Sequence, residues 1–263
     1  MIIMLGLLGL AFGSFVNALV WRLHNKRDFV SERSECTHCH HVLAWNDLIP
    51  VVSWVMLRGR CRYCHKPIDD SPVVELVTAA LFVLSYVGWP LGFADAGIAL
   101  FVMWLVALVA LVALAVYDLR WYLLPDVIVF PLAVLGIVAG LVRFISVEQL
   151  TVLQAFTEIT MGIIVISGLY FVLYEVSKGK WVGFGDVKLG VFIGAILGWK
   201  YALLALFTAN LAGLLFVLPL LAMKKLTPKS KIPFGPFLII GCIISFLWGP
   251  QIIGWYLSFI LAV

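Results

Sequence analysis

Long apolar segments follow one another along most of this 263-residue chain, and they limit what it can fold into. A helix needs about 20 consecutive apolar residues to cross the hydrocarbon core of a bilayer. Candidate spans lie at residues 1–20, 73–91, 96–117, 126–143, 158–176, 187–199, 201–222 and 234–261. With 63% hydrophobic and 12% charged residues, the composition is also unlike that of a soluble domain. The sequence therefore predicts an all-α polytopic membrane protein with about eight transmembrane helices.

Lysine and arginine indicate how these helices are oriented, because positively charged loops stay on the cytoplasmic side. With the N-terminus outside, all but Arg143 and Lys200 of the 18 basic residues fall in cytoplasmic segments. The net charge of +4 is thus explained by topology and anionic lipid, and nucleic-acid binding is not expected. No basic residue precedes the first apolar run and Arg22 follows it, so we interpret this run as a retained anchor and not a signal peptide.

Three parts are expected from this pattern: a first transmembrane helix at 1–21, a cytoplasmic loop at 22–72 and a membrane-embedded core at 73–263. The loop carries two Cys-x-x-Cys pairs, which supply the four thiolates of a tetrahedral zinc site: Cys36, Cys39, Cys61 and Cys64. A reducing cytoplasmic location favours structural zinc over the alternatives of disulfides or a redox role. Nearby histidines could replace a thiolate, but we interpret them as solvated loop residues: His38, His40, His41 and His65.

Two acids, Asp118 and Asp186, stand at the edges of apolar segments, 68 residues apart in the sequence. A charged side chain at bilayer depth costs about 2.5–3.5 kcal/mol on insertion scales, so such an acid is by default a functional hypothesis. The charge pattern places both at the cytoplasmic ends of their helices. Each is therefore the candidate partner of the other.

Two carboxylates that share a site cannot both ionise cheaply, so one holds a proton while the other acts as a base on water. This chemistry predicts amide hydrolysis by general acid and base. Gly183 and Gly185 flank Asp186 in a Gly-x-Gly-Asp pattern, and we expect them to adopt unusual torsions that admit an extended substrate. The simpler interpretation is that both acids are helix-end charges. Asp126, which follows Pro125, is expected to be a helix cap or a supporting group.

At this point the chain resembles the type IV prepilin peptidases, a family of bacterial membrane aspartic proteases that also methylate their products. The resemblance rests on the cysteine loop and four further segments: Gly13-Ser14-Phe15-Val16-Asn17, Asp118-Leu119-Arg120 with Leu124-Pro125-Asp126, Gly183-Phe184-Gly185-Asp186-Val187-Lys188, and Pro233-Phe234-Gly235-Pro236-Phe237.

This resemblance implies that Asp118 and Asp186 are the catalytic pair, with Lys188 and Asp126 in supporting roles. It implies cleavage of prepilins or pseudopilins after a glycine that ends a short basic leader, at the cytoplasmic face of the bacterial inner membrane. It also implies methylation of the new N-terminus with S-adenosylmethionine as the donor. The oligomeric state is not implied.

Three other functions fit some of these features. A proton- or cation-coupled transporter could use Asp118 and Asp186, but both lie on one side and not near the midplane where transport sites usually sit. A scaffold could dock a partner through the cysteine loop, which leaves the Gly-x-Gly-Asp pattern unexplained. A presenilin-like protease shares that pattern but not the cysteine loop.

Overall fold

The structure is a computed structural model that describes residues 1–28, 33–68, 70–225, 227 and 231–261. The described residues are mostly helical, and their only β contacts are two isolated bridges, Glu35 with Val42 and Arg60 with Pro67. Six helical stretches are long and apolar enough to cross a membrane. The prediction of an all-α polytopic membrane protein is therefore confirmed.

The chain divides into two compact units. The first comprises residues 1–87 with 111–116, and the second comprises 88–110 with 117–263. This grouping joins the first helix, the cysteine loop and the next helix in one unit, whereas the sequence divides them at residues 21 and 72. The functional boundaries expected there stay a prediction.

The first unit contains α1 (Ile2–His24), the 3-10 turn η1 (Trp45–Asp47), the short α2 (Val52–Met56) and α3 (Val73–Val87). α1 packs against α3, and the absence of a side chain at Gly9 lets its backbone approach Ala79. The cysteine loop is fastened to this pair, because the Val51 N–H donates to Glu75 Oε2 over 2.6 Å. The carboxylate of Glu75 thereby holds the start of α2 at the start of α3.

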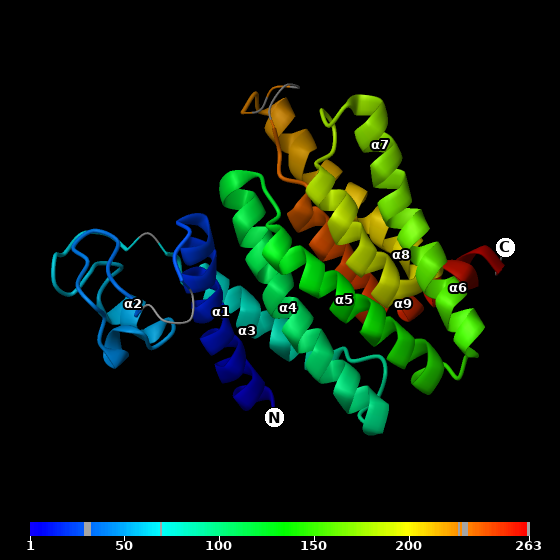
Figure 1. Cartoon of the computed structure of the whole chain (residues 1–263), viewed down its shortest axis with the longest axis horizontal. Coiled ribbons are helices and arrows are strands. Elements are labelled where there is room, and N and C mark those ends of the chain that lie inside the picture. Colours follow the sequence, from blue (N-terminus) through cyan, green and yellow to red (C-terminus); the bar gives the residue numbers. More distant parts are fainter. Residues whose placement is uncertain (29–32, 69, 226, 228–230, 262–263) are drawn as a thin grey trace. The chain divides into compact units, whose positions relative to one another are not determined.

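The second unit contains the remaining helices, apart from residues 111–116 of α4, and Figure 1 shows α5 to α9 side by side. Their bounds are α4 (Asp95–Trp121), α5 (Asp126–Val142), the π-helix η2 (Arg143–Val147), α6 (Val152–Ile163), the π-helix η3 (Ile164–Gly168), α7 (Leu169–Ser177), α8 (Phe184–Ala222) and α9 (Gly235–Leu261). α8 is the central element, since α5, α6, η3 and α9 all pack against it. Buried aromatic rings add to this core, with Trp104 stacked on Phe246 at 4.1 Å.

The 39 residues of α8 form two segments that meet at Gly198. Gly198 has φ 70° and ψ 170°, a conformation that side chains other than glycine rarely adopt. A Cβ there would also lie 2.8 Å from the Phe144 ring and 3.0 Å from the Glu158 carboxylate. Arg143 stabilises the break, because its guanidinium donates to the carbonyl of Ile196 over 2.9 Å, one of the unpaired carbonyls at the end of the first segment.

The contacts of α9 show that the chain reverses direction at this break. Gly249, late in α9, lies against Tyr201, while Gly213 lies against Phe234 just before α9 begins. The second segment of α8 therefore runs antiparallel to α9 and returns to the end from which α8 started. The two segments of α8 cover the predicted stretches 187–199 and 201–222, which together count as one of the six long apolar helices, and α9 continues without interruption through Pro250.

Glycine pairs allow the helices around α8 to touch backbone to backbone, and this predicts a strong effect of Gly194→Val. A Cβ at Gly194 would overlap the backbone of Gly162 at the end of α6. Overpacking of this kind costs about 1–3 kcal/mol or more. We expect a marked fall in the thermal unfolding midpoint in detergent. The matched control is Gly168→Ala, whose Cβ would meet nothing closer than Ile164 at 3.6 Å; equal midpoints for the two variants would contradict the packing described.

Candidate active site and metal centre

The two aspartates occupy facing ends of different helices. Asp118 lies in the last turn of α4, which ends where Tyr122 adopts a left-handed conformation, and Asp186 lies in the first turn of α8. Both carboxylates are buried, with 6% and 7% of the residue exposed. Burying two acids without an ion pair is unfavourable unless hydrogen bonds hold them. The hydrogen bonds of each therefore define the site.

Asp118 is held by the start of α9. The Gly235 N–H donates to Asp118 Oδ2 over 3.0 Å. A side chain at Gly235 would place its Cβ 2.7 Å from the same oxygen, so only glycine allows this approach. Backbone N–H groups at a helix N-terminus stabilise negative charge, and this contact fixes one oxygen of Asp118.

Asp186 is held by its own helix. The Gly183 N–H donates to Asp186 Oδ2 over 3.2 Å, which caps the start of α8. The expectation of unusual glycine torsions is wrong. Gly183 has an ordinary extended backbone (φ −78°, ψ 148°), and Gly185 is not among the glycines with positive φ. Gly185 instead allows close packing, because a Cβ there would lie 2.9 Å from Leu124 Cβ.

Leu124 connects the surroundings of the two aspartates. It contacts Gly185 on one side and Gly235, next to the Asp118 carboxylate, on the other. Asp118 and Asp186 are also close enough to interact electrostatically. The structure thus brings together the two acids that the sequence paired, and each keeps an oxygen that its backbone partner does not use.

The four cysteines of the loop also converge. The sulfur atoms of Cys36, Cys39, Cys61 and Cys64 all lie within 4.8 Å of one another, and this group could hold a metal ion. All five cysteines of the chain, Cys242 included, are free, so the disulfide alternative finds no support. The two Cys-x-x-Cys turns, here called knuckles, have the same hydrogen-bond geometry. The Cys36 N–H donates to the His41 carbonyl, and the Cys61 N–H donates to the Lys66 carbonyl.

The loop histidines that the structure describes are not part of this sulfur cluster. His41 packs on the ring of Tyr63 at 3.6 Å, and His40 contacts the Glu35 carboxylate at 3.3 Å. Hydrogen bonds from His40 and then Arg27 hold the pKa of Glu35 below its usual range. The carboxylate of Glu35 is therefore paired with basic side chains of the same loop, Arg27 and His40.

Proximity changes the acidity of the thiols. Burial raises the pKa of Cys36, but N–H groups of Cys39 and His38 and the neighbouring sulfurs lower it to about 6. In Cys39 the His41 N–H lowers the pKa, yet burial and the other sulfurs raise it to about 11. Ionising one thiol thus opposes ionising the next. A bound cation removes this conflict, since a coordinating thiol is deprotonated outright.

Comparison with known proteins decides the family. Residues 7–89 match the Bacterial Peptidase A24 N-terminal domain, and residues 105–218 match the Type IV leader peptidase family. A protein of Stutzerimonas stutzeri named Prepilin leader peptidase/N-methyltransferase is 33% identical over 96% of this chain and 92% of its own length. The chain belongs to the type IV leader peptidase family. Two proteins of the same name are also similar to this chain. The one from Pseudomonas aeruginosa is 33% identical over 96% of this chain and 92% of its own length. The one from Aeromonas hydrophila is 36% identical over 86% of this chain and 75% of its own length. No solved structure matches.

The two matched regions of this leader peptidase separate the two candidate centres. The N-terminal match contains the cysteine cluster, and the peptidase match contains Asp118 and Asp186. The contact of Gly235 with Asp118 was not predicted, although the Pro233-Phe234-Gly235-Pro236-Phe237 motif gave a signal at that place. Gly235 lies beyond the peptidase match, so the site is completed by α9.

Lys188, two residues after Asp186, forms an ion pair with Asp126. Lys188 Nζ lies 2.6 Å from Asp126 Oδ1, which joins the start of α8 to the start of α5, and the ammonium also lies over the rings of Phe130 and Phe184. Asp126 follows the N-cap Pro125 and belongs to the first turn of α5. If Asp126 has a supporting role, it acts through the Lys188 ammonium, which is its ion-pair partner.

We expect Asp126→Asn to have only a modest effect. Half of the Asp126 side chain is exposed, and exposed ion pairs contribute about 0–1 kcal/mol. Cleavage should fall by less than about tenfold, a limit of 1.4 kcal/mol in the barrier. Initial rates on a model prepilin measure this. A loss as large as that caused by Asp118→Asn or Asp186→Asn would show that Asp126 belongs to the reacting groups.

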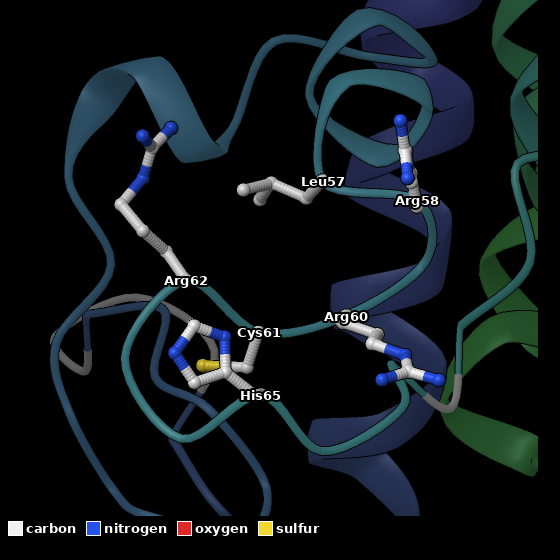
Figure 2. Close-up of a pocket in the computed structure, with 6 residues that line it drawn as sticks. All are labelled: Leu57, Arg58, Arg60, Cys61, Arg62 and His65. Carbon is white, nitrogen blue, oxygen red and sulfur yellow. The ribbon is translucent and has the colours of Figure 1, made fainter.

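A cationic hollow of about 460 Å³ lies beside the sulfur cluster (Figure 2). It is lined by Leu57, Arg58, Arg60, Cys61, Arg62 and His65. Arg62 is already paired, since its Nε lies 2.7 Å from Asp47 Oδ1. Burial raises the pKa of Asp47, but the hydrogen bond and charge of Arg62, the Ala44 N–H and the Tyr63 hydroxyl together hold it below its usual range. This ion pair ties η1 to the second knuckle.

Proposed function

We propose that this protein is a membrane aspartic endopeptidase that removes the leader from type IV prepilins or pseudopilins after a glycine. The observation that carries the proposal is the convergence of two buried carboxylates from α4 and α8, held by Gly235 and Gly183. Relatives named prepilin leader peptidases match nearly the whole chain. None of the relatives named above is a transporter, and both acids lie at one end of their helices.

The geometry supports hydrolysis by a shared water. One aspartate is ionised and takes a proton from water, whose oxygen adds to the carbonyl carbon of the scissile bond. The other aspartate is protonated and gives its proton to the amide nitrogen, so that the C–N bond breaks and the amine leaves. The backbone bonds from Gly183 and Gly235 keep the two carboxylates oriented while their free oxygens face the water.

The charge pattern and the second unit support a cytoplasmic site in the inner membrane. The start of α8, the end of α4 and the start of α9 meet around Asp118 and Asp186, the two acids that form the proposed catalytic dyad. Lys224 and Lys225 follow the end of α8, which returns to the same side. Arg143 and Lys200 flank the break at Gly198, at the far end of the first segment of α8. Retention of basic residues on one side supports cytoplasmic placement of the dyad.

The cysteine cluster supports a structural zinc ion. A tetrahedral ion with bonds of about 2.3 Å separates its sulfurs by about 3.8 Å, and the Cys36 and Cys64 sulfurs lie 3.9 Å apart. The spacing therefore fits. When bound, zinc would organise the loop and neutralise the thiolates. We also propose N-methylation of the product with S-adenosylmethionine, which rests on the names of the relatives, and no residue is assigned to the donor.

The proposal is tested with purified full-length protein in detergent and a model prepilin that carries a basic leader ending in glycine. Mass spectrometry should show cleavage after that glycine, and a further mass increment of one methyl group when S-adenosylmethionine is added. A folded protein that leaves the prepilin intact would overturn the peptidase. Cleavage without the methyl increment at saturating donor would overturn only the methyltransferase.

A further inference from the structure

We propose that the hydroxyl of Tyr170 donates a hydrogen bond to the carbonyl oxygen of the scissile bond as it becomes an oxyanion. The inference rests on the peptidase function proposed above. Tyr170 was not singled out in the sequence, because it is one of eight tyrosines and lies in an apolar helix with no motif around it.

The position of Tyr170 follows from its helical neighbours. One turn before it, the Ser167 hydroxyl donates to the Val187 carbonyl over 2.5 Å. One turn after it, the Tyr174 ring packs on Phe184 at 5.3 Å. Side chains three and four apart share a helix face, so Tyr170 meets α8 between these two contacts, where Asp186 lies.

Two further observations place Tyr170 at the dyad. Its phenol interacts electrostatically with Asp186. Its ring lies 5.8 Å from that of Phe234, which immediately precedes the Gly235 that binds Asp118. Tyr170 therefore faces Asp186 from one side and the anchor of Asp118 from the other. The π-helix η3 ends two residues before it, and such wide turns occur often at functional sites.

The hydroxyl of Tyr170 is buried and unpaired. The residue is 3% exposed, and its oxygen makes no hydrogen bond within the described part of the chain, although Asn210 lies nearby. Buried hydroxyls nearly always have a partner, and leaving one unpaired is unfavourable. An unpaired donor beside two carboxylates is explained if its partner is the substrate.

The reaction needs such a donor. Negative charge develops on the carbonyl oxygen while the aspartates act on the water and the amide nitrogen. The backbone N–H groups of Gly183 and Gly235 are already bound to Asp186 and Asp118. The phenol of Tyr170 is held in place by packing, and its hydroxyl has no partner among the described residues. It would act on the substrate without carrying the transferred proton.

The test compares Tyr170→Phe with Tyr174→Phe, a partly exposed tyrosine one turn along the same helix. Loss of one oxyanion donor lowers kcat about 10²–10³-fold, and we expect this for Tyr170→Phe with KM unchanged. Tyr174→Phe should stay within about twofold of wild type, a difference under 0.5 kcal/mol. The pH profile of Tyr170→Phe should keep the wild-type shape, because the aspartates are intact.

Several outcomes separate this inference from the peptidase proposal. A Tyr170→Phe protein with wild-type kcat would overturn the inference alone, provided that Asp186→Asn is inert. An equal loss in both tyrosine variants, or a lower unfolding midpoint for Tyr170→Phe, would assign the hydroxyl a structural role and also overturn it. An inert wild type would overturn the peptidase itself.

Discussion

Asp186→Asn and Asp118→Asn should each abolish cleavage, with kcat falling by at least about 10⁴-fold, as when one member of a catalytic set is removed. Asparagine keeps a side-chain oxygen that can accept the N–H of Gly183 or Gly235, so the local hydrogen bonds survive. What is lost is the ability to take or give a proton. Initial rates on a model prepilin, with unfolding midpoints measured alongside, check this result.

The matched control for Asp118→Asn is Asp95→Asn, an exposed acid in the first turn of the same helix α4. It should retain wild-type cleavage. The double variant Asp118→Asn/Asp186→Asn should be no slower than either single variant, because residues that act as one unit lose their function together. Additive losses, or residual cleavage by one single variant, would show that the two acids work separately.

How far the sequence predicted this site depended on the range of each interaction. The placement of Asp118 and Asp186 at helix ends was predictable, because the limits of the apolar runs mark helix ends without any tertiary contact. The break at Gly198 was predictable as a gap between two spans. Its stabilisation by Arg143 was not, because that bond joins residues 53 apart.

Contacts between distant residues account for the rest. The role of Gly185 was assigned to torsion, whereas the structure shows packing on Leu124, and nothing local distinguishes these two uses of glycine. The N–H of Gly235 and the phenol of Tyr170 reach the dyad only after α9 and α7 have packed on α8. The cysteine spacing, by contrast, carries its own geometry, and the cluster formed as predicted.

That cluster leads to the second large expected effect, in a Cys36→Ser/Cys61→Ser variant. This change takes one ligand from each knuckle. Metal binding to structural zinc sites contributes about 10–16 kcal/mol, and the described loop residues 33–68 have little apolar core, with Cys61 their only buried hydrophobic residue. We expect elemental analysis to show loss of one zinc per chain, and limited proteolysis to cut within this loop while the membrane helices stay intact.

The control is Cys242→Ala, which removes a buried thiol from α9, far along the chain from the knuckles. It should keep its zinc and its loop resistant to protease. Chelator treatment of the wild type should reproduce the cysteine variant, because folding of the loop and binding of the ion are one equilibrium. If the Cys36→Ser/Cys61→Ser loop resisted protease without metal, the hydrogen bonds of the knuckles and the Asp47–Arg62 ion pair would suffice to fold it, and zinc would have another role.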